Sequence, residues 1–118
     1  MIRNYFYKWP HTERSIITDQ DSNSAVILEV YNYDVDDTVK SGDGYIWSLF
    51  VNASFRGQGI GRMLLKKAED IARDSGCKKV FLDWSHEESE QWVLEWYERN
   101  GYEEVAFGPE RTLLRKYL

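Results

Sequence analysis

Apolar and polar positions in the first third of the chain follow the pattern of short β-strands. Residues 2–9 are rich in aromatic side chains and predict an edge strand. Pro10 ends it, because proline has no N–H to donate to a sheet. Residues 14–18 predict a second strand, and the polar run 19–24 predicts a turn. Residues 25–31 are β-branched and nearly all apolar, which predicts a strong third strand.

The middle of the chain predicts a strand, a glycine-rich turn, a helix and another strand. Residues 45–51 form the strand, and residues 59–75 have helical periodicity with Ile60, Leu64 and Ala68 on one face. Gly76 stands where a C-terminal cap belongs. Residues 79–84 predict the next strand. Because strand–helix–strand crossovers are right-handed, we expect the two strands to lie parallel.

The last third predicts a second helix followed by a hairpin. Ser85 and Glu88 have the spacing of a capping box, which predicts a helix from about residue 87 to residue 100, ended by Gly101. Residues 102–107 and 112–118 predict two closing strands joined through Gly108 and Pro109. The apolar stripe of this helix consists of Trp92, Val93, Trp96 and Tyr97.

Composition is that of a single folded domain over residues 1–118, with 42% hydrophobic residues. A net charge of −5 argues against nucleic acid as the main partner. No apolar run approaches the roughly 20 residues of a membrane span, so no membrane partner is expected. Cys77 is the only cysteine, and residues 1–5 lack the features of a signal peptide. We therefore expect a cytoplasmic protein without disulfides.

The turn between strand and helix has the composition of an anion-binding loop. It contains Gly57, Gly59 and Gly61, flanked by Arg56 and Arg62. Glycines let a backbone approach a ligand closely, and a helix start offers about four unpaired N–H groups at its positive end. A phosphate is the most suitable ligand. Neither the dinucleotide fingerprint nor the P-loop pattern fits this run.

Two motifs in this order carry a family resemblance. The pattern Arg56-x-x-Gly59-x-Gly61 resembles the coenzyme-A pyrophosphate loop, R/Q-x-x-G-x-G/A, of the GCN5-related N-acetyltransferases. Residues 92–102 resemble a later motif of that family through Tyr97 and the Gly101-Tyr102 pair, whereas its Asn and Ala positions hold Glu90 and Val93. Residues 112–116 also look like the last strand of that family. The resemblance covers about residues 44–118.

The resemblance implies an α/β fold with a mostly antiparallel central sheet, one parallel pair splayed open, and two main helices. Acetyl-coenzyme A would lie in that opening as the cosubstrate, with its pyrophosphate on backbone N–H groups of residues 58–62. Its pantetheine arm would pair with residues 49–51 as an added strand. The cofactor-binding residues implied are Leu49, Phe50, Val51, Arg56, Gly57, Gln58, Gly59, Ile60, Gly61, Arg62 and Tyr97.

The implied reaction transfers an acetyl group to a primary amine by direct attack in a ternary complex. Deprotonating an amine with a pKa of about 10.4 costs roughly 4–5 kcal/mol at pH 7. A backbone N–H near Val51 is the candidate for polarising the carbonyl, and Tyr97 is the candidate general acid. Many family members carry a base, a glutamate, on the strand before the glycine turn, but residues 46–50 offer none. Asp83 is the candidate base, with His86 and Glu87 as alternatives.

A base-free route, in which the enzyme selects the neutral amine and relies on proximity, is also open. The family usually places helices between its first two strands, and here none is predicted before Gly44, so the acceptor side should be open. A homodimer or a large acceptor, such as a protein amine, would then complete the site. The alternatives to an enzyme are a non-catalytic coenzyme-A-binding or regulatory module and an adaptor protein. No metal site is expected, because the aspartates of residues 34–43 lack calcium-loop spacing and His11 and His86 have no partner ligands.

Overall fold

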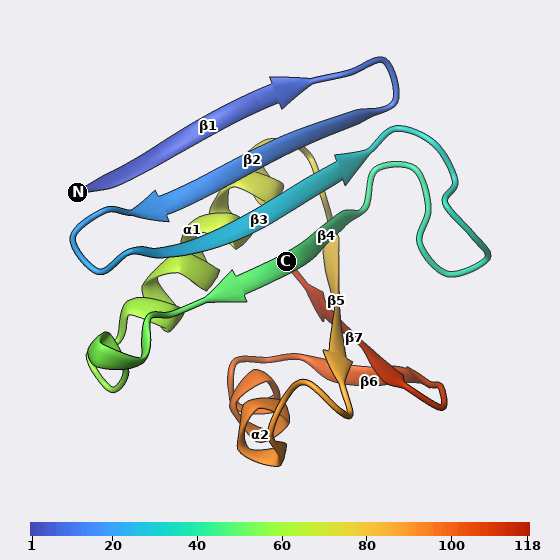
Figure 1. Cartoon of the computed structure of the whole chain (residues 1–118). Helices are drawn as coiled ribbons and strands as arrows, with labels where there is room; N and C mark the ends of the chain where they lie inside the picture. Colours follow the sequence, from blue (N-terminus) through green and yellow to red (C-terminus); the bar gives the residue numbers. More distant parts are fainter.

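Seven strands form one sheet in the order β1-β2-β3-β4-β5-β7-β6 in the computed structural model, which describes residues 1–118 (Figure 1). All neighbouring strands are antiparallel except β4 and β5. The predicted fold class is therefore confirmed, and no helix precedes β4. The strands are β1 (Ile2–Lys8), β2 (Thr12–Asp19), β3 (Ser24–Tyr31), β4 (Gly44–Phe50), β5 (Lys79–Ser85), β6 (Glu103–Phe107) and β7 (Arg111–Tyr117). The helices are α1 (Ile60–Asp74), α2 (Gln91–Arg99) and the 3-10 turn η1 (Ala53–Phe55).

The predicted start of the second helix is wrong by about four residues, since α2 begins at Gln91. One of the two hydrogen bonds of the capping box forms, because the Glu88 N–H donates to Ser85 Oγ at 3.2 Å. It closes a single turn, however, and Glu90 is extended immediately before the helix. The indole N–H of Trp84 donates to the Glu90 carbonyl at 3.2 Å, which holds that extended residue in place. The spacing of a capping box predicts a local hydrogen bond, but the same bond can stabilise an isolated turn. It therefore does not by itself locate the start of a helix.

The parallel pairing of β4 and β5 is only three residues long. It runs from Gly44 opposite Val80 to Ile46 opposite Leu82. The next residue of β4, Trp47, is an extra residue in the pairing with β3, where Ile27 opposes Ser48 and Leu28 opposes Ile46. Such a bulge bends its strand and increases its twist. Beyond it, β4 and β5 separate, as Figure 1 shows, and their facing edges have no strand partner.

One main core joins α1 and α2 to the sheet. Helix α1 contacts β2, β3 and β4, and buries Leu64 and Ala68 as its periodicity predicted. It also buries Glu69, whose carboxylate accepts hydrogen bonds from the Tyr102 hydroxyl at 2.8 Å and from Lys116 Nζ at 2.9 Å. This pairing satisfies a charge that would otherwise be costly to bury. It connects α1 to the C-terminal hairpin.

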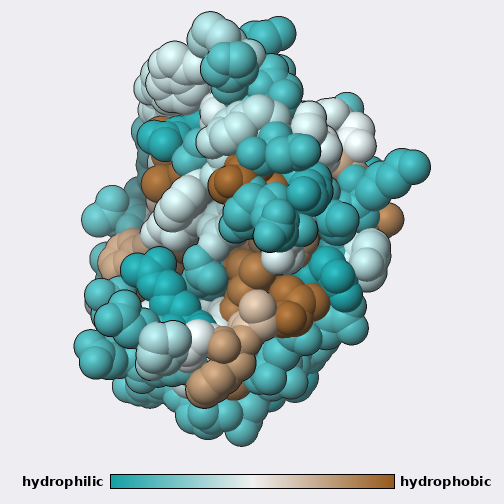
Figure 2. Space-filling model, turned by 90° about the vertical axis from the view of Figure 1, so that its right-hand side faces the viewer, coloured by the Kyte–Doolittle hydropathy of each residue, from teal (hydrophilic) through white to brown (hydrophobic).

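The opposite face of the sheet is covered over part of its area by the loop between β3 and β4. Val39 of this loop is buried with Tyr31 and Phe81 in a second, smaller cluster. Asp36 holds the loop by accepting hydrogen bonds from the N–H groups of Thr38 and Val39. The molecular face in Figure 2 is mostly hydrophilic, with a brown to tan hydrophobic group that extends from the centre downward and smaller groups toward the sides. None of the helices is both long enough and apolar enough to cross a membrane.

The short parallel pair requires a glycine at residue 44. A Cβ at this position would lie 2.9 Å from Val80 Cγ1, and both residues are buried. We expect Gly44→Ala to lower the free energy of unfolding by about 1–3 kcal/mol, because overpacking forces the two strands apart. Urea denaturation followed by circular dichroism measures the change. The exposed Ser41→Ala is the matched control and should change stability by less than about 0.5 kcal/mol. Equal stability of the two variants would contradict this role of Gly44.

Candidate functional site: two cavities that meet at Leu49 and Tyr97

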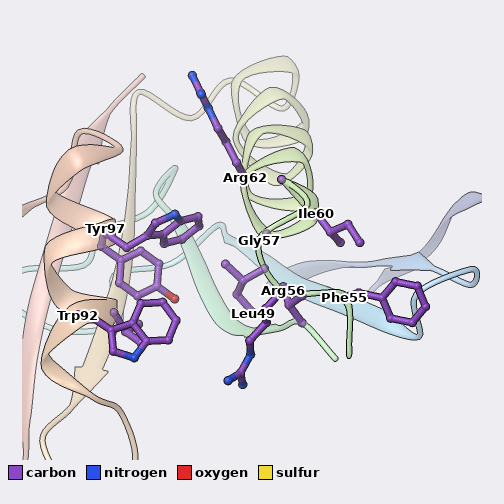
Figure 3. A pocket seen from close by; sticks show the side chains of 13 residues that line it. Leu49, Phe55, Arg56, Gly57, Ile60, Arg62, Trp92 and Tyr97 are labelled. Carbon is purple, nitrogen blue, oxygen red and sulfur yellow. The ribbon is translucent and has the colours of Figure 1, made fainter. Parts of the chain in front are cut away.

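A cavity of about 390 Å³ lies between the start of α1, the end of β4 and one face of α2 (Figure 3). In Figure 3, Tyr97 and Trp92 extend from α2 on one side, and Leu49 lies between them and the glycine turn. The lining residues are Leu49, Val51, Phe55, Arg56, Gly57, Gly59, Ile60, Gly61, Arg62, Trp92, Val93, Trp96 and Tyr97. The helix start and the apolar face of α2 thus border the same space.

The glycine turn presents unpaired backbone donors to this cavity. Gly57 and Gly59 have φ of 82° and 79°, a conformation that favours glycine. No side chain caps the start of α1, and none of the N–H groups from residue 57 to residue 62 donates to a backbone carbonyl. Arg56 and Arg62 are exposed and form no ion pair. Unpaired N–H groups at a positive helix end between two free cations form an anion site.

The third glycine has a different role. A Cβ at Gly61 would lie 3.3 Å from Val51 Cγ2 and 3.6 Å from the Trp96 ring. The start of α1 is therefore packed closely against the end of β4 and against α2. This packing fixes the unpaired N–H groups relative to the cavity.

The edge of β4 that faces β5 is also free for a ligand. Pairing with β5 ends at Ile46, whereas pairing with β3 continues to Phe50. Leu49 and Val51 line the cavity beyond that point. Backbone groups on this edge need hydrogen-bond partners, and an extended amide-containing chain can supply them as an added strand.

A second cavity of about 410 Å³ opens on the other side of the same separation between β4 and β5. It is lined by Tyr45, Ile46, Trp47, Ser48, Leu49, Leu82, Asp83, Ser85, Glu88, Ser89, Tyr97 and Arg111. Leu49 and Tyr97 belong to both linings. The two cavities therefore meet at these side chains, one cavity rich in apolar residues and glycines and the other in polar and charged residues.

Tyr97 is protonated at the junction. Burial alone raises the pKa of its phenol to about 12. The hydroxyl has no hydrogen-bond partner within the protein, and the ring packs edge-on against Trp96 and Tyr102. A neutral phenol of this kind is a hydrogen-bond donor that remains available for a ligand.

Asp83 lines the second cavity and is held there by two neighbours. The Tyr45 hydroxyl donates to Asp83 Oδ2, and Arg111 Nη1 lies 4.0 Å from the same oxygen. Burial, and then the Asp83 carboxylate, raise the pKa of the Tyr45 phenol well above its usual range, so Tyr45 is the donor. Oδ1 of Asp83 has no hydrogen-bond or ion-pair partner.

The other candidate bases and the thiol lie elsewhere. His86 is placed between the Trp84 and Phe107 rings, with Nε2 2.9 Å from Thr112 Oγ1, and it lines neither cavity. Glu87 is exposed and lines neither cavity. Cys77 is buried in the core, and burial is the main cause that raises the pKa of its thiol to about 11. No group of three or more His, Cys, Asp or Glu side chains is arranged to hold a metal ion.

The structure brings together most of the residues that the sequence assigned to the cofactor. Phe50 and Gln58 line neither cavity; both side chains are exposed, and the role predicted for them uses backbone groups. Four lining residues were missed as site residues: Phe55, Trp92, Val93 and Trp96. Three of these belong to the apolar stripe of α2. Leu94, which lies outside that stripe, is the one buried residue of the helix. The nine residues of α2 include two tryptophans and one tyrosine, more large aromatic side chains than the helix buries in the core. This surplus of aromatic side chains is the sequence signal that one face of the helix lines a cavity.

The comparisons with known proteins agree with this geometry. Residues 3–102 match the model of the acetyltransferase (GNAT) family, and the chain belongs to that family. It is similar to the thialysine N-epsilon-acetyltransferase of Bos taurus, with 37% identity over 51 residues, and to the glucosamine 6-phosphate N-acetyltransferase of Trypanosoma brucei brucei, with 41% identity over 59 residues. The matches cover 41% and 50% of this chain, but only 30% and 37% of those proteins. The chain therefore spans less than half the length of these curated relatives.

Among solved structures, the fold resembles the PaiA N-acetyltransferase of Thermoplasma acidophilum, which was crystallised in complex with coenzyme A. The TM-score is 0.70 at 15% sequence identity, and the match covers 92% of this chain and 62% of that chain. At this identity the likeness establishes the fold. The family membership rests on the sequence match.

The anion site at the glycine turn, here called the anion cradle, predicts that a negative charge at residue 59 weakens binding of acetyl-coenzyme A. A Cβ on Gly59 would have no atom within 4 Å, so a side chain there extends into open space beside the unpaired N–H groups. We expect Gly59→Glu to bind acetyl-coenzyme A at least about tenfold more weakly than Gly59→Gln, because its carboxylate repels the pyrophosphate. Isothermal titration calorimetry measures both constants.

The glutamine variant is the matched control, because it shares the backbone strain and the size of the glutamate variant. Thermal melts should show the two variants to be equally stable. Equal affinities for acetyl-coenzyme A would mean that its phosphates do not lie at this turn.

Proposed function

We propose that this protein is an acetyl-coenzyme-A-dependent N-acetyltransferase that acetylates a primary amine by direct attack in a ternary complex. The observation that carries the proposal is the meeting of two cavities at Leu49 and Tyr97. One cavity ends at an anion cradle, and the other has an ionisable lining. A thioester placed along the free edge of β4 would present its carbonyl at the junction, where an amine can reach it from the opposite side.

The first cavity has the groups that coenzyme A requires. Unpaired N–H groups of residues 57–62, with Arg56 and Arg62, would hold the pyrophosphate. The free edge of β4 at residues 49–51 would pair with the amides of the pantetheine arm. Trp92 and Trp96 would cover the apolar parts of that arm. Acetyl-coenzyme A would supply the acetyl group and leave as the thiol.

Tyr97 would stabilise the departing sulfur. Its phenol is protonated at neutral pH and unpaired, so it is ready to donate a hydrogen bond as negative charge develops on sulfur. A phenol with a pKa near 12 does not by itself give up its proton to a thiolate of pKa about 8.5. Its proton moves to sulfur as the attacking nitrogen, now positively charged, loses its own proton and restores the phenol. The amine thus becomes an amide, and the thioester sulfur becomes a thiol.

Asp83 is the candidate acceptor for the proton that the ammonium must lose before it attacks. It lines the acceptor side and keeps Oδ1 free. Tyr45 already donates to its other oxygen, so Oδ1 is the atom left to bind an ammonium. The amine proton would therefore pass through Asp83 to water, and placement of the neutral amine against the thioester supplies much of the rate acceleration.

The relatives support an amine as the acceptor. Both curated relatives named above are N-acetyltransferases by name, one acting on thialysine and the other on glucosamine 6-phosphate. These two acceptors share a primary amine and differ in charge. The chemistry of this chain's second cavity is therefore the guide to its own acceptor.

Removal of the Tyr97 hydroxyl tests the reaction. We expect Tyr97→Phe to lower kcat by about 10²–10³-fold, because a positioned proton donor contributes about that much. The KM for acetyl-coenzyme A should change by less than about twofold. Release of the free thiol, measured with a chromogenic thiol reagent, follows turnover. We expect no reaction of Cys77 with that reagent in the folded protein, because its thiol is buried.

Tyr117→Phe is the control for loss of a tyrosine hydroxyl, because Tyr117 is exposed and lines neither cavity. Both variants should show kcat/KM rising about tenfold per pH unit below the pKa of the amine, because the amine titrates in this range and Tyr97 does not. Unchanged kcat in Tyr97→Phe would contradict the assigned role. Acetyl-coenzyme A binding without turnover on any amine would favour a non-catalytic coenzyme-A-binding module.

A further inference from the structure

The second cavity combines a partly buried carboxylate with an aromatic wall. Asp83 has a side chain 25% exposed, and its Oδ1 has no partner in the protein. Both of its contacts, from Tyr45 and from Arg111, are made to Oδ2. A carboxylate oxygen that borders a cavity and lacks a donor is a binding point for a cationic hydrogen-bond donor.

The aromatic wall is fixed beside this carboxylate. The rings of Tyr45 and Trp47 lie 4.9 Å apart between centroids, with an angle of 36° between their planes. The indole N–H of Trp47 donates to the Tyr31 hydroxyl at 3.2 Å, and the Tyr45 hydroxyl donates to Asp83. Trp47 is nevertheless 52% exposed, so its ring is open to a ligand. An indole face attracts cations, and this one is held in place before any ligand arrives.

The net charge of the cavity lining is negative. Its ionisable residues, apart from the two tyrosines, are Asp83, Glu88 and Arg111. Arg111 is 58% exposed and already lies against Asp83, so its charge is partly neutralised and screened by solvent. Glu88 is exposed and forms no ion pair. An ammonium group entering this cavity meets two carboxylates and an indole face, whereas a phosphate or carboxylate meets one paired guanidinium.

We propose, on the basis of the proposed function, that the acceptor is a small organic cation with a primary amine and no anionic group. Asp83 Oδ1 and the Trp47 ring bind its ammonium, and Glu88 attracts cations at the entrance. The cavity of about 410 Å³ accommodates a molecule the size of an alkyl- or arylalkylamine. Amines that carry a phosphate or carboxylate are rejected because they would place an anion beside Asp83 and Glu88.

The test uses acceptors that differ in charge, and three of them, butylamine, 1,4-diaminobutane and 4-aminobutanoate, share a four-carbon chain. Wild-type protein is assayed by thiol release with butylamine, 1,4-diaminobutane, phenethylamine, 4-aminobutanoate and glucosamine 6-phosphate. We expect kcat/KM for butylamine, diaminobutane and phenethylamine to exceed that for 4-aminobutanoate by at least about tenfold, because its carboxylate adds a repulsive pair in a partly buried site. A preference for 4-aminobutanoate or glucosamine 6-phosphate would overturn the proposal.

Charge variants separate recognition from folding. Glu88→Gln should raise the KM for butylamine about 3- to 10-fold, leave kcat within about twofold, and leave the KM for acetyl-coenzyme A unchanged. Glu87→Gln is the matched control, because Glu87 is exposed and lines neither cavity. Arg111→Gln should lower the butylamine KM, because it removes the positive charge that partly neutralises the Asp83 and Glu88 carboxylates. Equal shifts in Glu88→Gln and Glu87→Gln, or a raised KM in Arg111→Gln, would contradict a charge-selective site.

Calorimetry with butylamine distinguishes failure of this proposal from failure of the proposed function. Turnover restricted to anionic amines would overturn the cation site and leave the acetyltransferase activity intact. Binding of butylamine that is lost in Asp83→Asn, without turnover of any amine, would support the cation site and overturn the activity. Absence of both butylamine binding and butylamine turnover would overturn the cation site.

Discussion

The short parallel contact between β4 and β5 is the constraint on which the site depends. Three residue pairs hold the two strands together, and Gly44 lets them approach closely beside Val80. The bulge at Trp47 then bends β4 away from β5. Had the pairing continued, the edge of β4 would be satisfied by β5, and both cavities would be closed. The site therefore exists because backbone pairing stops early, while β3 and β7 support the two strands from outside.

No helix precedes β4, and the two halves of the sheet are held in place by the loop between β3 and β4 and by α1. The first 31 residues form three antiparallel strands, and the loop that follows contributes Val39 to a small core on the open face of the sheet. On the other face, buried Glu69 pairs with Tyr102 and Lys116 and connects α1 to the hairpin β6–β7. Both halves of the divided sheet are thus anchored to α1 or to that loop. This anchoring keeps the separation of β4 and β5 open without a covering helix.

The two cavities differ in chemistry because they use different faces of the same elements. Leu49 and Val51 face the glycine turn and the apolar face of α2, whereas Tyr45 and Trp47 face Asp83 and the polar end of β5. Tyr45 and Trp47 lie side by side because residues two apart in a strand share a face. The bulge then shifts the alternation, so that Leu49, opposite Val26, falls on the same face as Ile46, opposite Leu28. The cavity proposed to bind an anion and the cavity proposed to bind a cation therefore lie on the two sides of Tyr97.

The sequence by itself determined the strands, the first helix, the glycine turn with Arg56 and Arg62, and the parallel order of β4 and β5. These features follow from local periodicity, from glycine conformation and from the handedness of crossovers. Each of these depends on residues that are close together in the sequence. Only the tertiary structure decided that α2 begins at Gln91, that its stripe lines a cavity, and that Asp83 leaves Oδ1 free. Those outcomes depend on contacts between residues far apart in the chain, such as Tyr45 with Asp83, and no local pattern specifies such a contact.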